Sequence, residues 1–203
     1  VNAYAGCASN MSGVATVSVS PLPIVYALSA GSGSYCAGDA GLNVVLSGSQ
    51  IGVSYQLYHL GSPVGLAKTG TGSALDFGLH TLTGNYIVVA TFTATGCMST
   101  SNTVTISLNT LPTVYNTTGG GAYCSGTAGV HIGLSFSSVG VNYQLYRGAT
   151  PVGSIIPGSN TSIDFGVFTT TGTYTVYATN ATSGCAIKML DSAVISVSPA
   201  PLP

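Results

Sequence analysis

Charged side chains are scarce in this 203-residue sequence, which has three basic and four acidic residues and a net charge of −1. They make up 3% of the chain, whereas a soluble globular protein carries about 25%. No basic surface is present that would attract nucleic acid or an anionic membrane. We therefore expect neither of these as a partner.

Tryptophan is absent, and so are long apolar runs. The mean hydropathy is +0.50, but Val, Ile and Ala are interleaved with Ser, Thr, Gly and Pro. No run of about 20 apolar residues occurs that could insert into a membrane. The 3.6-residue period of an amphipathic helix is also missing, which indicates an all-β protein.

The sequence repeats itself after 88 residues: "VSYQLYHLGSPVG" at 53–65 returns as "VNYQLYRGATPVG" at 141–153. Other pairs keep this offset, namely "SYCAGDAG" with "AYCSGTAG", "LDFG" with "IDFG", and "TGNYIVVAT" with "TGTYTVYAT". Residues 1–23 resemble the end of each repeat. We interpret 1–23 as the C-terminal strands of a preceding partial repeat, followed by complete repeats at 24–112 and 113–203, and expect a longer array.

Within each repeat, alternating apolar residues predict about seven short strands. The inward positions are expected to be Val53, Tyr55 and Leu57 in the first copy, and Val141, Tyr143 and Leu145 in the second. Turn residues separate the strands at short spacing. This pattern predicts immunoglobulin-like (Ig-like) Greek-key β-sandwiches, with Tyr86 and Tyr174 in tyrosine corners. Because tryptophan is lacking, we expect a broader Ig-like domain rather than an antibody relative.

Proline-rich segments follow the last strand of each repeat: "SPLP", "NTLP" and "SPAP". Proline-rich connectors are extended and semi-rigid. The sequence therefore predicts tandem sandwiches arranged head-to-tail.

Together the motifs "YCxG", "GVxYQLY", "PVG", "G(N/T)Y", "GC" and the Pro–X–Pro ends resemble the tandem Ig-like repeats of large secreted surface proteins of Bacteroidetes. That family includes gliding-motility adhesins and other cargo of the type IX secretion system. The resemblance covers almost the whole chain. It implies export, a cell-surface or filament location and a structural or adhesive role, without an active site.

Each complete repeat has two cysteines, Cys36 and Cys97 in the first and Cys124 and Cys185 in the second. In an exported domain the default interpretation is a disulfide within each repeat, Cys36–Cys97 and Cys124–Cys185, with Cys7 bonded to an upstream partner. No C-x-x-C spacing that would indicate zinc occurs.

Strand direction argues against pairing within a repeat. In a strictly alternating seven-strand sandwich the two cysteines would lie at opposite poles, well beyond the ~7 Å between Cα atoms that a disulfide allows. Two alternatives stay open: an inter-repeat bond between Cys36 and Cys185, and free thiols.

The residues that could support catalysis do not form a site. None of the three histidines recurs in both repeats, and surface positions are expected for all of them. Asp76 and Asp164 recur in "DFG", but the other kinase elements are absent, so each is expected to bond its adjacent turn. No acid cluster suited to calcium is present. The sequence predicts no enzyme, no cofactor and no metal site.

We therefore expect a structural repeat segment of an extracellular surface filament or adhesin stalk, whose partners are neighbouring repeats of the same or identical chains. Low surface charge favours such association, or a covering of sugar. "DSA" resembles the Bacteroidetes O-glycosylation motif with Ser192 as acceptor, and Asn10, Asn116, Asn160 and Asn180 open N-x-S/T sequons. The alternatives are a polysaccharide-binding module that uses outward Tyr58 and Tyr146, and a passive spacer in a large secreted protein.

Overall fold

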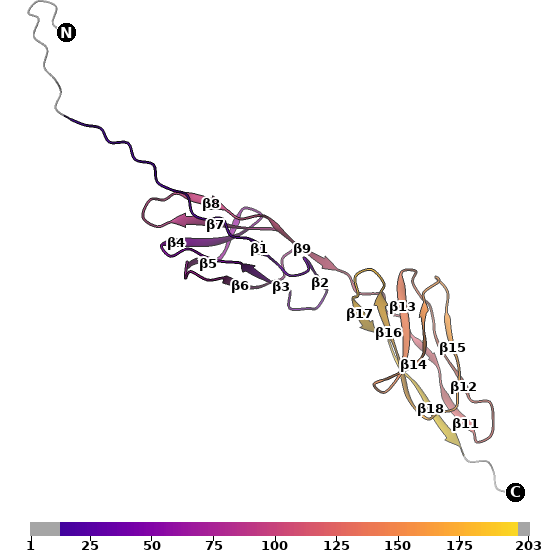
Figure 1. Cartoon of the computed structure of the whole chain (residues 1–203). Helices are drawn as coiled ribbons and strands as arrows, with labels where there is room; N and C mark the ends of the chain where they lie inside the picture. The colour runs from indigo at the N-terminus through magenta and orange to yellow at the C-terminus, as the bar shows by residue number, and fades with distance from the viewer. Residues whose placement is uncertain (1–12, 199–203) are drawn as a thin grey trace, which may run out of the picture. The chain divides into compact units, whose positions relative to one another are not determined.

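The computed structural model describes residues 13–198, and this part of the chain contains strands and no helix (Figure 1). The first repeat forms nine strands: β1 (Leu28–Ser29), β2 (Ser34–Cys36), β3 (Leu42–Leu46), β4 (Val53–His59), β5 (Ser62–Thr69), β6 (Leu75–His80), β7 (Gly84–Phe92), β8 (Met98–Thr100) and β9 (Val104–Asn109).

The second repeat forms the same set of strands in the same order. They are β10 (Thr117–Gly119), β11 (Gly121–Cys124), β12 (Val130–Leu134), β13 (Val141–Arg147), β14 (Thr150–Pro157), β15 (Ile163–Phe168), β16 (Gly172–Asn180), β17 (Ala186–Lys188) and β18 (Ala193–Ser198).

Each repeat builds one three-stranded and one six-stranded sheet. The orders are β1-β3-β6 and β2-β9-β7-β4-β5 in the first repeat, with β8 added to β7. In the second they are β10-β12-β15 and β11-β18-β16-β13-β14, with β17 added to β16. This is the Ig arrangement in which the first strand is split between the two sheets. The predicted all-β fold of tandem Ig-like sandwiches is confirmed.

The split first strand was not predicted. β2 and β11 are short, and each runs parallel to the last strand of its repeat: Cys36 lies opposite Asn109, and Cys124 opposite Ser198. The sequence did not predict them because three or four residues are too few to show an alternating period. The Gly- and Ser-rich residues before them also give no sign that the chain crosses from one sheet to the other.

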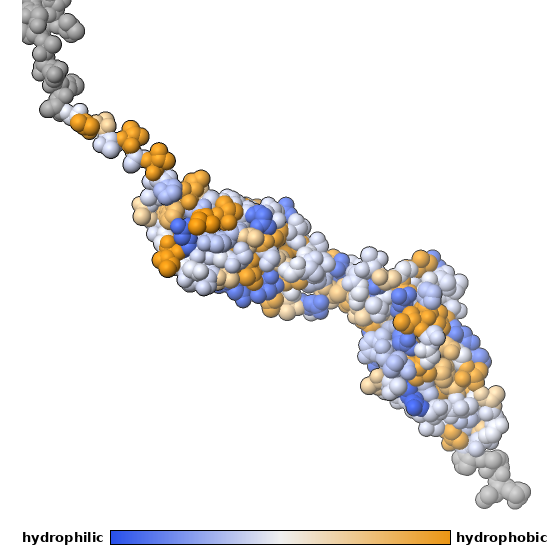
Figure 2. Space-filling view, in the orientation of Figure 1, coloured by the Kyte–Doolittle hydropathy of each residue, from blue (hydrophilic) through white to orange (hydrophobic). Residues whose placement is uncertain are grey.

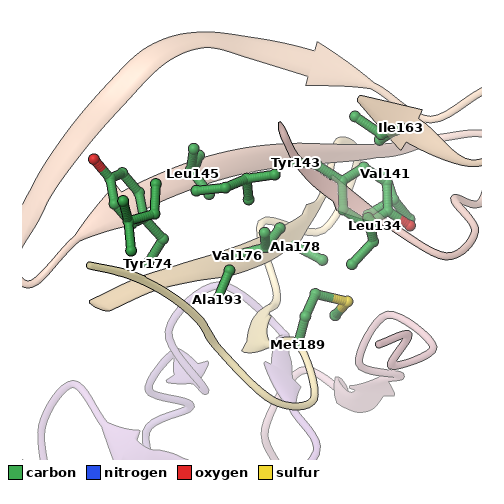
Figure 3. Packing of buried hydrophobic residues seen from close by; sticks show 12 residues of the cluster. Leu134, Val141, Tyr143, Leu145, Ile163, Tyr174, Val176, Ala178, Met189 and Ala193 are labelled. Atoms are coloured by element: carbon green, nitrogen blue, oxygen red, sulfur yellow. The ribbon is translucent and has the colours of Figure 1, made fainter. Parts of the chain in front are cut away.

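Side chains of both sheets meet in the core, which Figure 3 shows for the second repeat. The predicted inward triplets are buried, with exposures of 0–1% for Val53, Tyr55 and Leu57. In the second repeat Val141, Tyr143 and Leu145 are 6%, 0% and 0% exposed. The alternation of apolar and polar residues therefore placed the inner face of the central strands correctly.

Tyrosines occupy the central position that tryptophan holds in antibody domains. Tyr55 on β4 and Tyr143 on β13 are fully buried, and their hydroxyls accept hydrogen bonds from the backbone N–H groups of Gln50 (2.8 Å) and Ser138 (2.9 Å). Burial raises the pKa of the Tyr55 hydroxyl. Each ring thus fills the core while its polar end stays satisfied.

The second repeat contains the predicted tyrosine corner. Tyr174 is 1% exposed and its hydroxyl donates a 2.8 Å hydrogen bond to the carbonyl of Thr170, four residues upstream. Tyr86 holds the corresponding place at the start of β7 and is fully buried. The corner fixes the chain where it enters β16.

A glutamine explains why "YQLY" and "PVG" recur together. The side-chain amide of Gln56 donates to the carbonyls of Leu57 (2.9 Å), Val64 (3.0 Å) and Gly65 (3.4 Å) at a bulge between β4 and β5. Gln144 makes the same three bonds beside the bulge between β13 and β14. A bulge leaves ladder groups unpaired, and the amide satisfies them.

By proximity of their Cα atoms, the described residues form two compact units. The first contains 13–29, 44–77 and 85–104, and the second contains 30–43, 78–84 and 105–198. The second unit therefore holds β2 of the first repeat together with all the strands of the second repeat.

The segment before β1 is extended and contains no strand. Val14, Val17 and Val19 are 92–94% exposed, and apolar and pale residues alternate along this segment in Figure 2. By sequence Val17 corresponds to Ile106 and Ile195, which are 1% and 2% exposed in β9 and β18. The same pattern thus forms a core strand where a sandwich surrounds it.

Candidate functional site

Within residues 13–198 a disulfide joins Cys36 to Cys185. Their Cα atoms are 5.6 Å apart, and the two cysteines are separated by 149 residues in sequence. Cys36 ends β2 of the first repeat, and Cys185 lies in the turn between β16 and β17 of the second. Both belong to the second compact unit. Cys185 is 1% exposed.

The expected bonds Cys36–Cys97 and Cys124–Cys185 are therefore wrong, and Cys97 and Cys124 are free. The alternative inter-repeat bond is the one that forms. Cys7 and its predicted upstream bond lie outside the described residues.

Strand topology explains the correction. In the second repeat Cys124 pairs with Ser198 at the end of β18, three residues beyond Ile195, which lies opposite Gly172 at the start of β16. Cys185 follows the other end of β16, where its carbonyl accepts a 2.8 Å bond from Asn180. The nine-residue β16 separates the two ends by nearly 30 Å at about 3.3 Å per residue, far beyond the reach of a disulfide.

The predicted outward tyrosines lie on equivalent strands but in different surroundings. Tyr146 on β13 is half-buried, and its ring meets that of Tyr177 on β16 edge-on, with centroids 5.3 Å apart and planes at 75°. Tyr146 is in register with Thr175, so Tyr177 is its diagonal neighbour across the strand pair. In the first repeat Tyr58 is half-buried and Val89 stands in place of Tyr177.

Beside this aromatic pair lies a hollow of about 340 Å³ lined by Tyr146, Gly148, Ala149, Tyr177, Thr179 and Ala186. Tyr177 is 41% exposed beside these mostly small residues. An aromatic wall with a hydroxyl at its rim can stack on the C–H face of a sugar and hydrogen-bond its hydroxyls. Tyr177 escaped the sequence analysis, although its replacement of Val89 between otherwise matching strands was a usable signal.

His131 and Asp164 form an exposed pair on the second repeat, with His131 Nδ1 2.9 Å from Asp164 Oδ2 and side chains 66% and 61% exposed. Asp164 Oδ1 also accepts a 2.8 Å hydrogen bond from the N–H of Gly166, two residues further along the same strand β15 and not in an adjacent turn as predicted. The Gly166 N–H and, after it, the His131 side chain lower the pKa of the Asp164 carboxyl. Asn43 replaces His131 in the first repeat.

His59 differs from the expected solvated histidine. It is half-buried and stacks on the ring of Tyr86, with centroids 4.6 Å apart. The ring therefore covers the buried corner tyrosine of the first repeat.

Ser192 is exposed in the turn before β18, next to Asp191, whose backbone has a φ of 59°. The sequon residues Asn116 and Asn160 are exposed, whereas Asn180 is half-buried and accepts bonds from the N–H groups of Thr182 and Ser183. Asn10 lies outside the described residues. Modification at any of these sites stays a prediction.

Residues 13–198 contain neither a metal-binding cluster nor a membrane-spanning helix. No three His, Cys, Asp or Glu side chains gather as they would around a metal ion. No helix is long and apolar enough to cross a membrane.

No protein-family model and no curated protein matches the chain. Among solved structures it is similar to the human OSCAR ligand-binding domain, at 15% identity and a TM-score of 0.39, covering 86% of this chain and 100% of that one. Murine CEACAM1b has 13% identity and a TM-score of 0.42, with 85% and 99% covered. The three N-terminal domains of the bacteriophage RB49 outer capsid protein Hoc have 14% identity and a TM-score of 0.37, with 85% and 59% covered.

Similarity at this level gives no argument about function. The sheet order and the core define the chain as a tandem Ig-like module.

Proposed function

We propose that this chain is a structural repeat segment of an extracellular surface filament or adhesin stalk, within a large secreted protein of the Bacteroidetes type. The observation that carries the proposal is the Cys36–Cys185 disulfide, which joins one repeat covalently to the next. Disulfides persist in oxidising environments such as the cell surface. The repeats are already joined through the backbone, and the disulfide limits how far the 149-residue separation between the two cysteines can be stretched under tension, whereas a ligand site has no need of it.

The surface supports association with further copies. β14 is an edge strand of its sheet. Most of its side chains are exposed, and none of them is charged. Its counterpart β5 contains only Lys68 as a charged residue. Charged side chains are one of the devices that prevent an edge strand from pairing with another chain. Pale and apolar residues also dominate the visible surface in Figure 2.

Immunogold electron microscopy of intact cells of the source organism tests this role. An antibody against the chain should label thread-like structures outside the cell, and the label should spread along each thread. Labelling confined to the cell interior, or isolated particles without threads, would contradict the proposal. A passive spacer in a large secreted protein would give surface label without threads.

A second candidate function is polysaccharide binding at the hollow beside Tyr146 and Tyr177. The observation that favours it is the aromatic pair of half-buried Tyr146 and exposed Tyr177, which the first repeat lacks. On a glycan array, the Tyr146→Ala variant should lose any binding that the unmodified chain shows. The matched Tyr58→Ala variant should retain it, because Val89 leaves that position without a second ring. Equal binding by both variants, or no bound glycan, would reject this candidate.

A further inference from the structure

Each free cysteine occupies the position in its repeat that a bonded cysteine occupies in the other repeat. Adding the repeat offset of 88 to Cys36 gives Cys124, and adding it to Cys97 gives Cys185. The bond in this chain joins the first cysteine of one repeat to the second cysteine of the next. A second bond of this kind needs a cysteine at a similar separation, which is 149 residues in the observed bond, either before Cys97 or after Cys124. Both positions fall outside the 203 residues.

The backbone around Cys124 matches that around bonded Cys36. Each cysteine lies opposite the last residue of its repeat's final strand, Asn109 or Ser198. The following residue donates its N–H to the carbonyl of that strand end, at 3.0 Å for Ala37 and 3.2 Å for Ser125. The two sites are therefore built alike, at the point where the chain leaves the sandwich.

The tyrosine that precedes each of these cysteines is held in the same way. Tyr35 and Tyr123 donate their hydroxyls to the carbonyls of Thr81 and Thr169. The short strand that carries the cysteine is thus fixed in both repeats.

Cys97 matches bonded Cys185 to the same degree. The carbonyl of each accepts a bond from the end of the preceding long strand, from Phe92 at 2.9 Å and from Asn180 at 2.8 Å. The N–H of each donates to a hydroxyl two residues upstream, Thr95 or Ser183, at 3.4 Å.

The free members of each pair are more exposed than the bonded members. Cys124 is exposed where Cys36 is half-buried, and Cys97 is half-buried where Cys185 is buried. Apolar residues at the start of the first repeat are also uncovered: Val25 is 59% exposed, whereas its counterpart Val114 packs against the core of the second repeat. Each free cysteine is therefore more accessible than the bonded cysteine at the same position of the other repeat.

We propose that Cys97 and Cys124 are the two open halves of the bond seen between Cys36 and Cys185, and that each takes a further repeat of this same kind as its partner. The inference deepens the proposed structural function by naming the partner and the residues that join it. In a series of copies, Cys124 of one copy bonds to Cys97 of the next, so the chain of sandwiches is linked covalently at every junction.

The oxidant is a small disulfide such as oxidised glutathione. The thiolate of one cysteine attacks it and forms a mixed disulfide, releasing one glutathione thiol. The second protein thiolate then displaces the other glutathione. Two protein thiols become one disulfide, and one oxidised glutathione becomes two reduced molecules.

The test uses residues 1–201 followed directly by a second copy of residues 24–203, so that Ile24 of the second copy follows Pro201 as it follows Pro23 in the chain. After oxidation with glutathione, peptide mapping without reduction should yield Cys36–Cys185 from each copy and a new peptide that joins Cys124 of the first copy to Cys97 of the second. In the single chain the same two cysteines should react with iodoacetamide. In the extended chain Cys124 of the first copy and Cys97 of the second copy should be protected from iodoacetamide.

The control is Cys124→Ser in the first copy, which should remove the new peptide and leave Cys97 of the second copy reactive. The Cys36–Cys185 peptides report that folding and oxidation succeeded. If they form while the junction cysteines stay reactive, or pair with other cysteines, the proposal is overturned. Because this test uses purified protein, its outcome is separate from that of the labelling experiment on cells.

Discussion

Many equivalent residues have the same structural role in both repeats. Tyr143 and Leu145 could be predicted to point inward, because alternation along a strand assigns every second residue to one face. The role of Gln144 could not be predicted from that pattern. Its side chain lies on the opposite face, and only the bulge beside it creates three carbonyls that need a donor.

Replacing Gln144 with alanine should lower the free energy of unfolding by about 1–3 kcal/mol, because half-buried carbonyls of the bulge lose their hydrogen bonds. Urea unfolding of the purified chain measures the change. Ser154→Ala, at an exposed position of neighbouring β14, should have almost no effect. Equal effects of the two substitutions would show that the amide does not hold the bulge.

The Asp164 carboxyl should titrate below its ordinary pKa, with Gly166 as the main cause and His131 as the next. A lowered pKa in the folded state stabilises the protein above the ordinary value of about 3.9, and that contribution is lost as the pH falls through the lowered value. NMR titration of the aspartate carboxyls measures the midpoint. His131→Asn, which copies the first repeat, should raise it partway, and an unchanged midpoint would contradict the assigned role of His131.

At the scale of strands and turns, the long strands were predictable and the short ones were not. The stretches that became β4, β7, β13 and β16 are long enough to show alternation. β2 and β8 have only three residues each. Missing β2 left the crossing between the two sheets unpredicted, although strand alternation had already placed the two cysteines of a repeat at opposite poles.

The corner between β15 and β16 should depend on one hydroxyl. Tyr174→Phe removes the bond to the Thr170 carbonyl and should cost about 1–2 kcal/mol of stability. Tyr177→Phe, in the same strand but 41% exposed, is the matched control and should cost much less. A thermal or urea unfolding series that ranks the two variants in the reverse order would exclude a tyrosine corner.

For the whole molecule, the repeat predicted the type of fold, and the family resemblance together with the low charge suggested a structural role. The choice among disulfide partners could not be made from spacing, since either pairing satisfies a count of two cysteines per repeat. It required the positions of the strand ends in space. The aromatic pair of the second repeat was missed for a related reason, because Tyr146 and Tyr177 meet only across two paired strands.

A covalent bond between repeats should limit how far the chain can be stretched. On the chain-entropy account, closing a loop of this length also stabilises the folded state by about 5 kcal/mol. Under tension, the 149-residue separation between Cys36 and Cys185 hides a length of about 50 nm at roughly 3.5 Å per residue.

Single-molecule stretching of the chain from its two ends, before and after reduction by dithiothreitol, therefore measures the bond directly. The oxidised chain should extend about 50 nm less than the reduced chain, and adding the reductant under constant force should release that length in one step. Two separate steps of about 20 nm would instead indicate a bond within each repeat. Those two steps, or equal extension in both states, would contradict a structural segment whose repeats are joined through Cys36 and Cys185.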